Sequence, residues 1–183
     1  IQTANHNGAN LVMACDPDAD RLGVGVLHHD EWVILSGNEI ASLVCMAALE
    51  GHPHAEPLVF KTEVTSSLVS RVSESMGARV VDHLLVGFKY IGEALFLLER
   101  KGRFGSVEGD VDCFAAGVEE SHGVLLSSAV RDKDTAGGAL VLAELAAQEG
   151  KQNRTLIDVL NDLMTDHGVV HNRLSSLAMT GAA

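Results

Sequence analysis

LVFKTEVTSSLVSRVSESMGARVVDHLL, residues 58–85, alternates between strand-like and helical patterns. The apolar run 58–61 predicts a strand, 65–76 predicts a helix that Gly77 stops, and 79–84 predicts a second strand. Such alternation is typical of a sheet layered with helices on its faces. The stretch therefore predicts an α/β fold, in the form of a layered α/β/α domain with a mixed sheet.

The same alternation continues on both sides of this stretch. Strands are expected over 9–15, 22–27, 32–35, 114–118 and 124–130, and helices over 38–50, 90–100, 135–148 and 155–168. Asn38 and Thr155 are the expected N-caps, because their side chains accept hydrogen bonds from free amides of a first helical turn. The run 9–15 is apolar enough to predict a buried strand, and the residues before Gly8 are interpreted as the tail of a helix.

Composition limits the classes of partner. The 183 residues include 46% hydrophobic but only 4% aromatic side chains, which favours layered helix and sheet packing. A formal net charge of -12 opposes a nucleic-acid backbone, so no nucleic-acid partner is expected. No apolar run reaches the ~18 residues of a membrane span, which predicts no membrane partner. Three widely spaced cysteines indicate reduced thiols and a cytoplasmic protein.

A carboxylate-rich loop, Asp16-Pro17-Asp18-Ala19-Asp20-Arg21, directly follows the strand expected over 9–15. Ligand sites of α/β sheets gather where strands end, and three converging carboxylates need a cation. Their oxygens are hard ligands that suit Mg²⁺ or Ca²⁺. An EF-hand is excluded, because it needs Gly and Glu where this chain has Arg21 and Leu27. The remaining alternative is a solvated turn in which Asp16 is a cap.

This loop and the Leu22-Gly23 that follows it resemble the magnesium loop of the α-D-phosphohexomutases, the superfamily of phosphoglucomutases and phosphomannomutases. The chain has Pro and Ala where other members have Gly. The resemblance implies that Asp16, Asp18 and Asp20 hold Mg²⁺ together with the phosphate on a serine. It also implies that Arg21 orients this phosphoserine.

The segment Gly87-Phe88-Lys89-Tyr90-Ile91-Gly92 lies between a predicted strand and a predicted helix, where backbone amides and Lys89 can meet an anion. By its residues alone it is equally a turn with a solvated lysine. It resembles the substrate loop of the family's third domain. The resemblance implies that Gly87 and Lys89 bind substrate.

The segment Glu119-Glu120-Ser121-His122-Gly123 offers carboxylates and a hydroxyl that can bind sugar hydroxyls, although its residues alone also fit a polar hairpin turn. It resembles the family's sugar-specificity loop, which implies that Glu119 and Ser121 hold the sugar. His122 receives no role, because phosphomannomutase-like members place a histidine where this chain has Gly123.

The segment Arg131-Asp132-Lys133-Asp134 precedes the helix expected over 135–148. Two cations can hold a phosphate there, and a lysine near a reacting hydroxyl can move a proton. The alternative is an ordinary charged first turn. The segment resembles the family's Arg-acid-Lys-Asp signature, which implies phosphate binding by Arg131 and acid/base catalysis by Lys133, with Thr135 where Gly is common.

The four motifs occur in family order and imply a domain organisation. Residues 1–55 are expected to be the C-terminal part of domain 2, with the metal loop, and 56–173 to be domain 3, with the sugar-binding loops. Residues 174–183 are expected to be a linker or frayed terminus. The family's phosphoserine loop is not evident, since Asn5 of the similar run Thr3-Ala4-Asn5-His6 has no hydroxyl to phosphorylate.

The resemblance implies a fragment of a Mg²⁺-dependent phosphohexomutase that interconverts hexose 1-phosphate and 6-phosphate through a phosphoserine and a hexose bisphosphate. Its partners would be these sugar phosphates and the remaining domains of the same polypeptide, without which it would be inactive. The alternative is a noncatalytic module that binds sugar phosphate and Mg²⁺. An aspartate-dependent phosphatase is less favoured, because Arg21 stands where Thr or Val is typical of that class.

Overall fold

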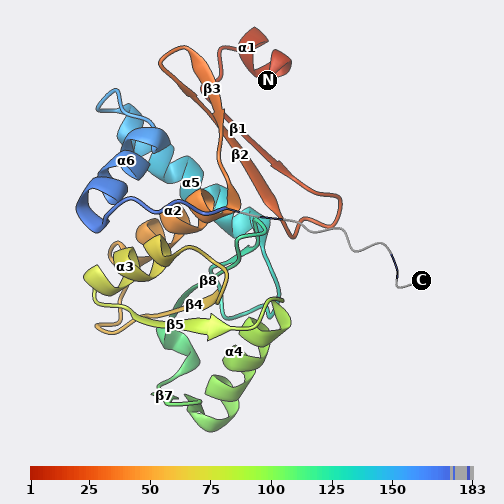
Figure 1. The fold of residues 1–183 in the computed structure, drawn as a ribbon, viewed down its shortest axis with the longest axis vertical. Coiled ribbons are helices and arrows are strands. Elements are labelled where there is room, and N and C mark those ends of the chain that lie inside the picture. Colours follow the sequence, from red (N-terminus) through yellow and green to blue (C-terminus); the bar gives the residue numbers. More distant parts are fainter. Residues whose placement is uncertain (174, 176–180, 182–183) are drawn as a thin grey trace.

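The structure is a computed structural model that describes residues 1–173, 175 and 181. The linker or frayed terminus predicted over 174–183 lies outside the described residues, apart from positions 175 and 181. In the described part of the chain, no helix has the length and apolar character needed to cross a membrane. Helices flank a mixed sheet, as the alternation in the sequence predicts (Figure 1).

Two larger sheets organise the chain. The first is antiparallel, in the order β1-β2-β3, with strands β1 (Leu11–Cys15), β2 (Leu22–His28) and β3 (Glu31–Ile34). The second has the order β5-β4-β8-β9, with strands β4 (Leu58–Thr62), β5 (Arg79–Leu84), β8 (Phe114–Val118) and β9 (Val124–Leu125). In this second sheet β4 is parallel to both β5 and β8, whereas β9 is antiparallel to β8. A short hairpin of β6 (Arg103–Phe104) and β7 (Val107–Glu108) was not predicted.

A layer of helices separates the two sheets (Figure 1). It contains α2 (Gly37–Leu49), α5 (Thr135–Gly150) and α6 (Leu156–His167), and α3 (Ser67–Ser75) extends it across the second sheet. The opposite face of the second sheet is covered by α4 (Lys89–Lys101). Two short elements complete the described chain, α1 (Gln2–His6) and the 3-10 turn η1 (Val111–Cys113).

The second sheet is buried on both faces, and β4 shows this most clearly. Val59 faces the cluster under the helical layer, whereas Leu58 and Phe60 face the cluster under α4. All three side chains are fully buried, and each such burial stabilises the fold by about 1.5–3 kcal/mol. Packing from both sides fixes the strands, and with them the loops that carry the predicted site.

The predicted N-cap of α2 is wrong. Ser36 is the cap: its hydroxyl accepts the amide of Glu39, and the Glu39 carboxylate accepts the amide of Ser36. This reciprocal pair satisfies two free amides and outcompetes a single cap. Asn38 instead lies in the first turn, where its side chain accepts the amide of Ser66 at 2.8 Å and joins α2 to the start of α3.

Two strand predictions also need correction. The strand over 9–15 was expected to be buried, but β1 is an edge strand whose residues are half-buried or exposed, because helices cover only one face of its sheet. The strand over 124–130 ends at Leu125. Beyond it Leu126 packs against the helical layer, and the chain turns so that the Asp134 amide donates to the Val124 carbonyl at 2.7 Å.

Candidate functional site

The carboxylate loop and the loop at 119–123 are joined directly, although about 100 residues separate them in the chain. The amide of Leu22 donates to the His122 carbonyl at 3.0 Å, and the His122 Nδ1 lies 3.1 Å from the Leu22 carbonyl oxygen. Arg21 and Gly123 also form an isolated antiparallel bridge. Two motifs predicted separately therefore form one structural unit, and His122 has a structural role in joining them.

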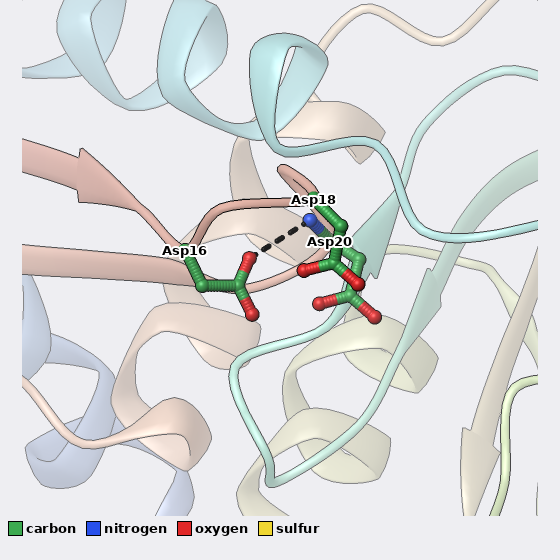
Figure 2. A group of neighbouring side chains, drawn as sticks. All are labelled: Asp16, Asp18 and Asp20. Carbon is green, nitrogen blue, oxygen red and sulfur yellow. Dashed lines mark hydrogen bonds between the residues drawn. The ribbon is translucent and has the colours of Figure 1, made fainter.

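The carboxylates of Asp16, Asp18 and Asp20 converge (Figure 2). One oxygen from each lies within 4.8 Å of the others. Asp16 Oδ1 accepts the amides of Asp20 and Arg21, both at 3.1 Å, so the first aspartate shapes the loop that carries the other two. Hard oxygen ligands at this separation fit a Mg²⁺ ion, which keeps part of its coordination shell for water or phosphate.

Arg21 lies against this cluster. Its Nε is 2.8 Å from Asp16 Oδ2 and 3.3 Å from Asp20 Oδ1. Partial desolvation opposes ionisation of Asp16, but the hydrogen bonds from Arg21 and Asp20 outweigh it and lower the pKa of Asp16 to about 2. The Arg21 side chain remains 59% exposed, so it is free to meet a further anion on its outer side.

Lys133 reaches the same cluster from the start of α5. Its Nζ is 3.1 Å from Asp20 Oδ2 and 2.9 Å from Asp132 Oδ1, and it lies 5.1 Å from the centre of the Phe88 ring. Desolvation favours the neutral amine, but hydrogen bonds to Asp132 and Asp20 raise the pKa of Lys133 above its usual value. The protonated form is therefore the stable one in this structure.

Glycine at position 123 makes room for this lysine. A Cβ atom at Gly123 would lie 2.5 Å from Lys133 Cδ and 3.2 Å from Glu119 Oε2. A Cβ atom at Gly123 would therefore require the Lys133 side chain to shift, so the glycine leaves room for Lys133 in its observed position against the 119–123 loop.

Glu119 and Gly87 are brought together. The Glu119 side chain is buried, Oε1 accepts the Gly87 amide at 3.1 Å, and Oε2 accepts the Ser121 hydroxyl at 3.4 Å. Burial raises the pKa of Glu119, against the opposing effects of Lys133 and the Gly87 amide. Glu119 thus contacts two other residues that are predicted to bind substrate.

Glu120 received no role from the sequence, but its side chain joins the 119–123 loop to the segment at the end of β4. Its Oε2 accepts the Thr62 hydroxyl at 3.0 Å and the Thr65 hydroxyl at 3.4 Å. Below them lies the buried Lys61, whose Nζ donates to the Thr65 carbonyl at 2.9 Å, and burial lowers the pKa of Lys61. The sequence signal that could have identified this contact is the pair Thr62 and Thr65, which follows the strand predicted over 58–61.

Two predicted substrate-binding cations point elsewhere in this structure. Arg131 Nη2 pairs with Glu99 Oε2 of α4 at 2.8 Å. Lys89 is exposed at the start of α4, with its Nζ 5.0 Å from the centre of the Tyr90 ring. Their assignment to substrate stays a prediction.

The predicted site does not coincide with two pockets in the described part of the chain. Pockets of about 300 and 490 Å³ lie beside the helical layer, and no predicted site residue lines either of them. The site is marked by converging charged side chains: the carboxylates, Lys133 and Glu119 come from loops at one end of the sheets.

The fold and this surface define a class of protein: layered α/β proteins that present a carboxylate cluster and polar loops where their strands end. The family model described as "Phosphoglucomutase/phosphomannomutase, alpha/beta/alpha domain III" matches residues 36–167. The chain belongs to this family, the α-D-phosphohexomutase superfamily.

Curated relatives carry names from the same group of enzymes. A phosphomannomutase of Mycoplasma genitalium is 31% identical over 170 residues, which cover 92% of this chain and 29% of the relative. A mouse glucose 1,6-bisphosphate synthase is 30% identical over 176 residues, which cover 92% of this chain and 27% of the relative. The chain thus spans less than a third of the length of these proteins.

The fold recurs among solved structures. A putative phosphomannomutase from Thermus thermophilus matches with a TM-score of 0.65 and 22% identity, over 87% of this chain and 31% of that one. A phosphoglucomutase/phosphomannomutase family protein from Burkholderia thailandensis matches with a TM-score of 0.62 and 18% identity, over 89% of this chain and 31% of that one.

Proposed function

We propose that the chain supplies the metal loop and the sugar-recognition loops of a phosphohexomutase that interconverts hexose 1-phosphate and hexose 6-phosphate through a phosphoserine and a hexose bisphosphate. One observation carries the proposal: the backbone of the carboxylate loop is bonded to the 119–123 loop, while Lys133 reaches Asp20. This arrangement supports the proposal, because the proposed metal ligands, proton donor and sugar-binding groups come from adjoining loops.

Asp16, Asp18 and Asp20 would hold Mg²⁺, as the spacing of their oxygens supports. A bound Mg²⁺ supplies positive charge that stabilises a transferring phosphoryl group. Arg21, whose guanidinium is partly exposed beside these ligands, would hold the phosphoserine in line with the sugar hydroxyl. The phosphoserine itself would come from another domain of the same polypeptide.

Glu119 and Ser121 would hold the sugar, since the exposed Ser121 hydroxyl can bind a sugar hydroxyl beside the Glu119 carboxylate. Gly87 would orient Glu119 through its amide, in addition to its predicted contact with substrate. Lys89 and Arg131 would bind the phosphate that is not transferred, Arg131 after leaving Glu99.

Lys133 would move the proton of the reacting hydroxyl. Its protonated form is stabilised by Asp20 and Asp132, which suits a group that donates a proton to the sugar oxygen as the phosphoryl group leaves. In the reverse direction the same nitrogen would take up the proton. Reduced cysteines and a cytoplasmic location remain part of the proposal.

A coupled mutase assay tests the reaction. This chain and the product of its uninterrupted reading frame are compared on glucose 1-phosphate and mannose 1-phosphate, with Mg²⁺ and a bisphosphate activator. We expect turnover by the longer protein alone. In that protein Asp18→Asn should lower kcat/KM by about 100-fold or more, whereas Asp30→Asn, in an exposed turn, should leave it unchanged.

Absence of turnover by the longer protein would contradict the mutase assignment. Saturable binding of sugar phosphate without turnover would then favour the noncatalytic module, and release of inorganic phosphate would favour a phosphatase. Asp18→Asn activity equal to that of Asp30→Asn would remove the proposed metal role of the loop.

A further inference from the structure

Ala19 lies in the middle of the carboxylate loop in a conformation that glycine adopts more easily. Its φ is 58°, in the left-handed region, where a Cβ atom crowds the following carbonyl. Alanine at such a position persists only when surrounding contacts hold it there. The contacts of Ala19 therefore bear on how the loop keeps its shape.

Thr135, the first residue of α5, holds Ala19. Its hydroxyl donates to the Ala19 carbonyl oxygen at 2.8 Å, and its amide donates to the same oxygen at 3.4 Å. The Thr135 side chain is 4% exposed, so water does not compete freely for this bond. Two residues earlier, Lys133 bonds the Asp20 carboxylate, and the loop is thus fixed at two neighbouring residues.

The bond from Thr135 also determines the direction of the next amide. The Ala19 carbonyl and the Asp20 N–H belong to one planar peptide group, in which they point in opposite directions. Thr135 holds the oxygen end of this group, and Asp16 Oδ1 accepts the N–H end at 3.1 Å. Rotation of the peptide would break both bonds and would displace the Asp20 carboxylate from the Asp16 carboxylate.

We infer that Thr135 is a positioning residue for the metal loop: its hydroxyl fixes the Ala19–Asp20 peptide so that the three carboxylates converge before a cation binds. This inference rests on the metal site of the proposed function. Thr135 is not assigned as a ligand, because the role inferred for its hydroxyl is to donate a hydrogen bond to the Ala19 carbonyl oxygen. Thr135 would raise the affinity for the cation by holding the carboxylate loop in its binding conformation before the cation arrives.

The test uses this chain and Mn²⁺ as a paramagnetic probe of the site, with the dissociation constant measured from water proton relaxation. Thr135→Val keeps the shape of the side chain but removes the donor, and should weaken Mn²⁺ binding about five- to tenfold. Thr135→Ser keeps the hydroxyl and should bind within about twofold of the unmodified chain. Thermal unfolding without metal shows whether each variant is folded.

A second arm separates positioning from packing. In the Thr135→Val background, Ala19→Gly should recover most of the lost affinity, because glycine adopts a φ of 58° without help. Hydrogen exchange of the Asp20 amide should be faster in Thr135→Val and unchanged in Thr135→Ser, because the peptide is released only when the hydroxyl is lost. If Thr135→Val does not fold, Thr135→Ala provides the same comparison.

Equal Mn²⁺ affinity in Thr135→Val and the unmodified chain would overturn the inference while leaving the metal site intact. Equal affinity in Asp18→Asn and the unmodified chain would overturn the metal site, and the inference with it. Thr135-dependent Mn²⁺ binding by this chain, together with no mutase turnover by the longer protein, would support the inference and reject the proposed reaction.

Discussion

Glu119 and Glu120 are neighbours in sequence, but their carboxylates occupy different environments. Glu119 faces the site, where the Gly87 amide and the Ser121 hydroxyl bind it and Lys133 lies nearby. Glu120 instead accepts the hydroxyls of two threonines, Thr62 and Thr65. Both residues lie where the chain turns after the end of β8 at Val118, and residue types alone do not reveal which carboxylate meets which partners.

The buried Glu119 carboxylate should make stability depend on pH. Because its pKa is raised in the folded chain, the folded state holds the proton more tightly than the unfolded state. Its contribution to the free energy of unfolding is therefore complete below the ordinary pKa of 4.5 and is lost as pH rises through the raised value. Glu119→Gln, which cannot ionise, should gain stability relative to the unmodified chain as pH rises from that point.

Urea unfolding at a series of pH values from about 4 to about 7 measures this difference. Glu144→Gln, on the exposed side of α5, controls for the loss of one negative charge. The prediction is that the free energy of unfolding of Glu119→Gln gains on that of the unmodified chain as pH rises. A difference that stays constant or shrinks would contradict it.

The first turn of α2 packs directly against the backbone of the 119–123 loop. Position 37 is a glycine because the loop backbone occupies the space of a side chain: a Cβ atom there would lie 2.0 Å from the Glu120 carbonyl oxygen and 2.7 Å from the His122 amide. The capping box of Ser36 and Glu39 holds this turn in place. An ordinary helical element therefore determines where the 119–123 loop can lie.

Gly37→Ala should lower stability and displace the loop. Overpacking against backbone costs about 1–3 kcal/mol, and the higher helix propensity of alanine, up to about 1 kcal/mol, offsets part of it. We expect a net loss of about 2 kcal/mol in the free energy of unfolding, with amide chemical-shift changes at Ser121 and His122. Both quantities are measured on this chain, by urea unfolding and by NMR.

Gly150→Ala is the matched control, since Gly150 also belongs to a helix and no atom lies within 4 Å of its added Cβ. It should leave the stability unchanged or raise it slightly. A Gly37→Ala variant as stable as Gly150→Ala, with an undisturbed loop, would show that α2 does not determine the position of the loop.

Across the whole molecule, one apolar cluster connects both sheets. It contains Leu22 of β2, Val59 of β4, Val124 of β9 and Leu142 of α5, together with residues of α2, α3 and α6. The division at residue 55 stays a prediction. The helix that precedes it, α2, nevertheless packs against α3, α5 and β8, which all follow it.

Because the core is shared, the chain should unfold in one transition. Trp32, the single tryptophan, reports on the first sheet by fluorescence, and far-UV circular dichroism reports mainly on the helices. The two urea curves should coincide. Leu142→Ala, at a fully buried position, should shift both curves together by a loss of about 2–5 kcal/mol.

Leu140→Ala provides the control on the same helix, since the Leu140 side chain is 70% exposed and its loss should change stability by less than about 0.5 kcal/mol. A Trp32 transition at lower urea than the loss of helix would indicate two independent units. That result would favour a separate unit over 1–55.

The sequence by itself determined the fold class and the carboxylate loop. Alternation of strands and helices depends on local periodicity, and α6 begins after Thr155 as its sequence predicts. A short loop confines Asp16, Asp18 and Asp20 to one small volume, and this part of their convergence is encoded locally, whereas the bond from Thr135 to this loop is not. Asn5, correctly interpreted as part of a helix tail, accepts the indole N–H of Trp32.

Only the tertiary structure decided how the motifs meet. The bonds between Leu22 and His122, between Lys133 and Asp20, and between Thr135 and Ala19 all join residues about 100 positions apart. No local pattern encodes such pairs, because they depend on how helices and sheets pack around a common core. The same packing decided that Ser36 rather than Asn38 caps α2 and that Arg131 pairs with Glu99. It also decided that Glu120 of the 119–123 loop bonds Thr62 at the end of β4.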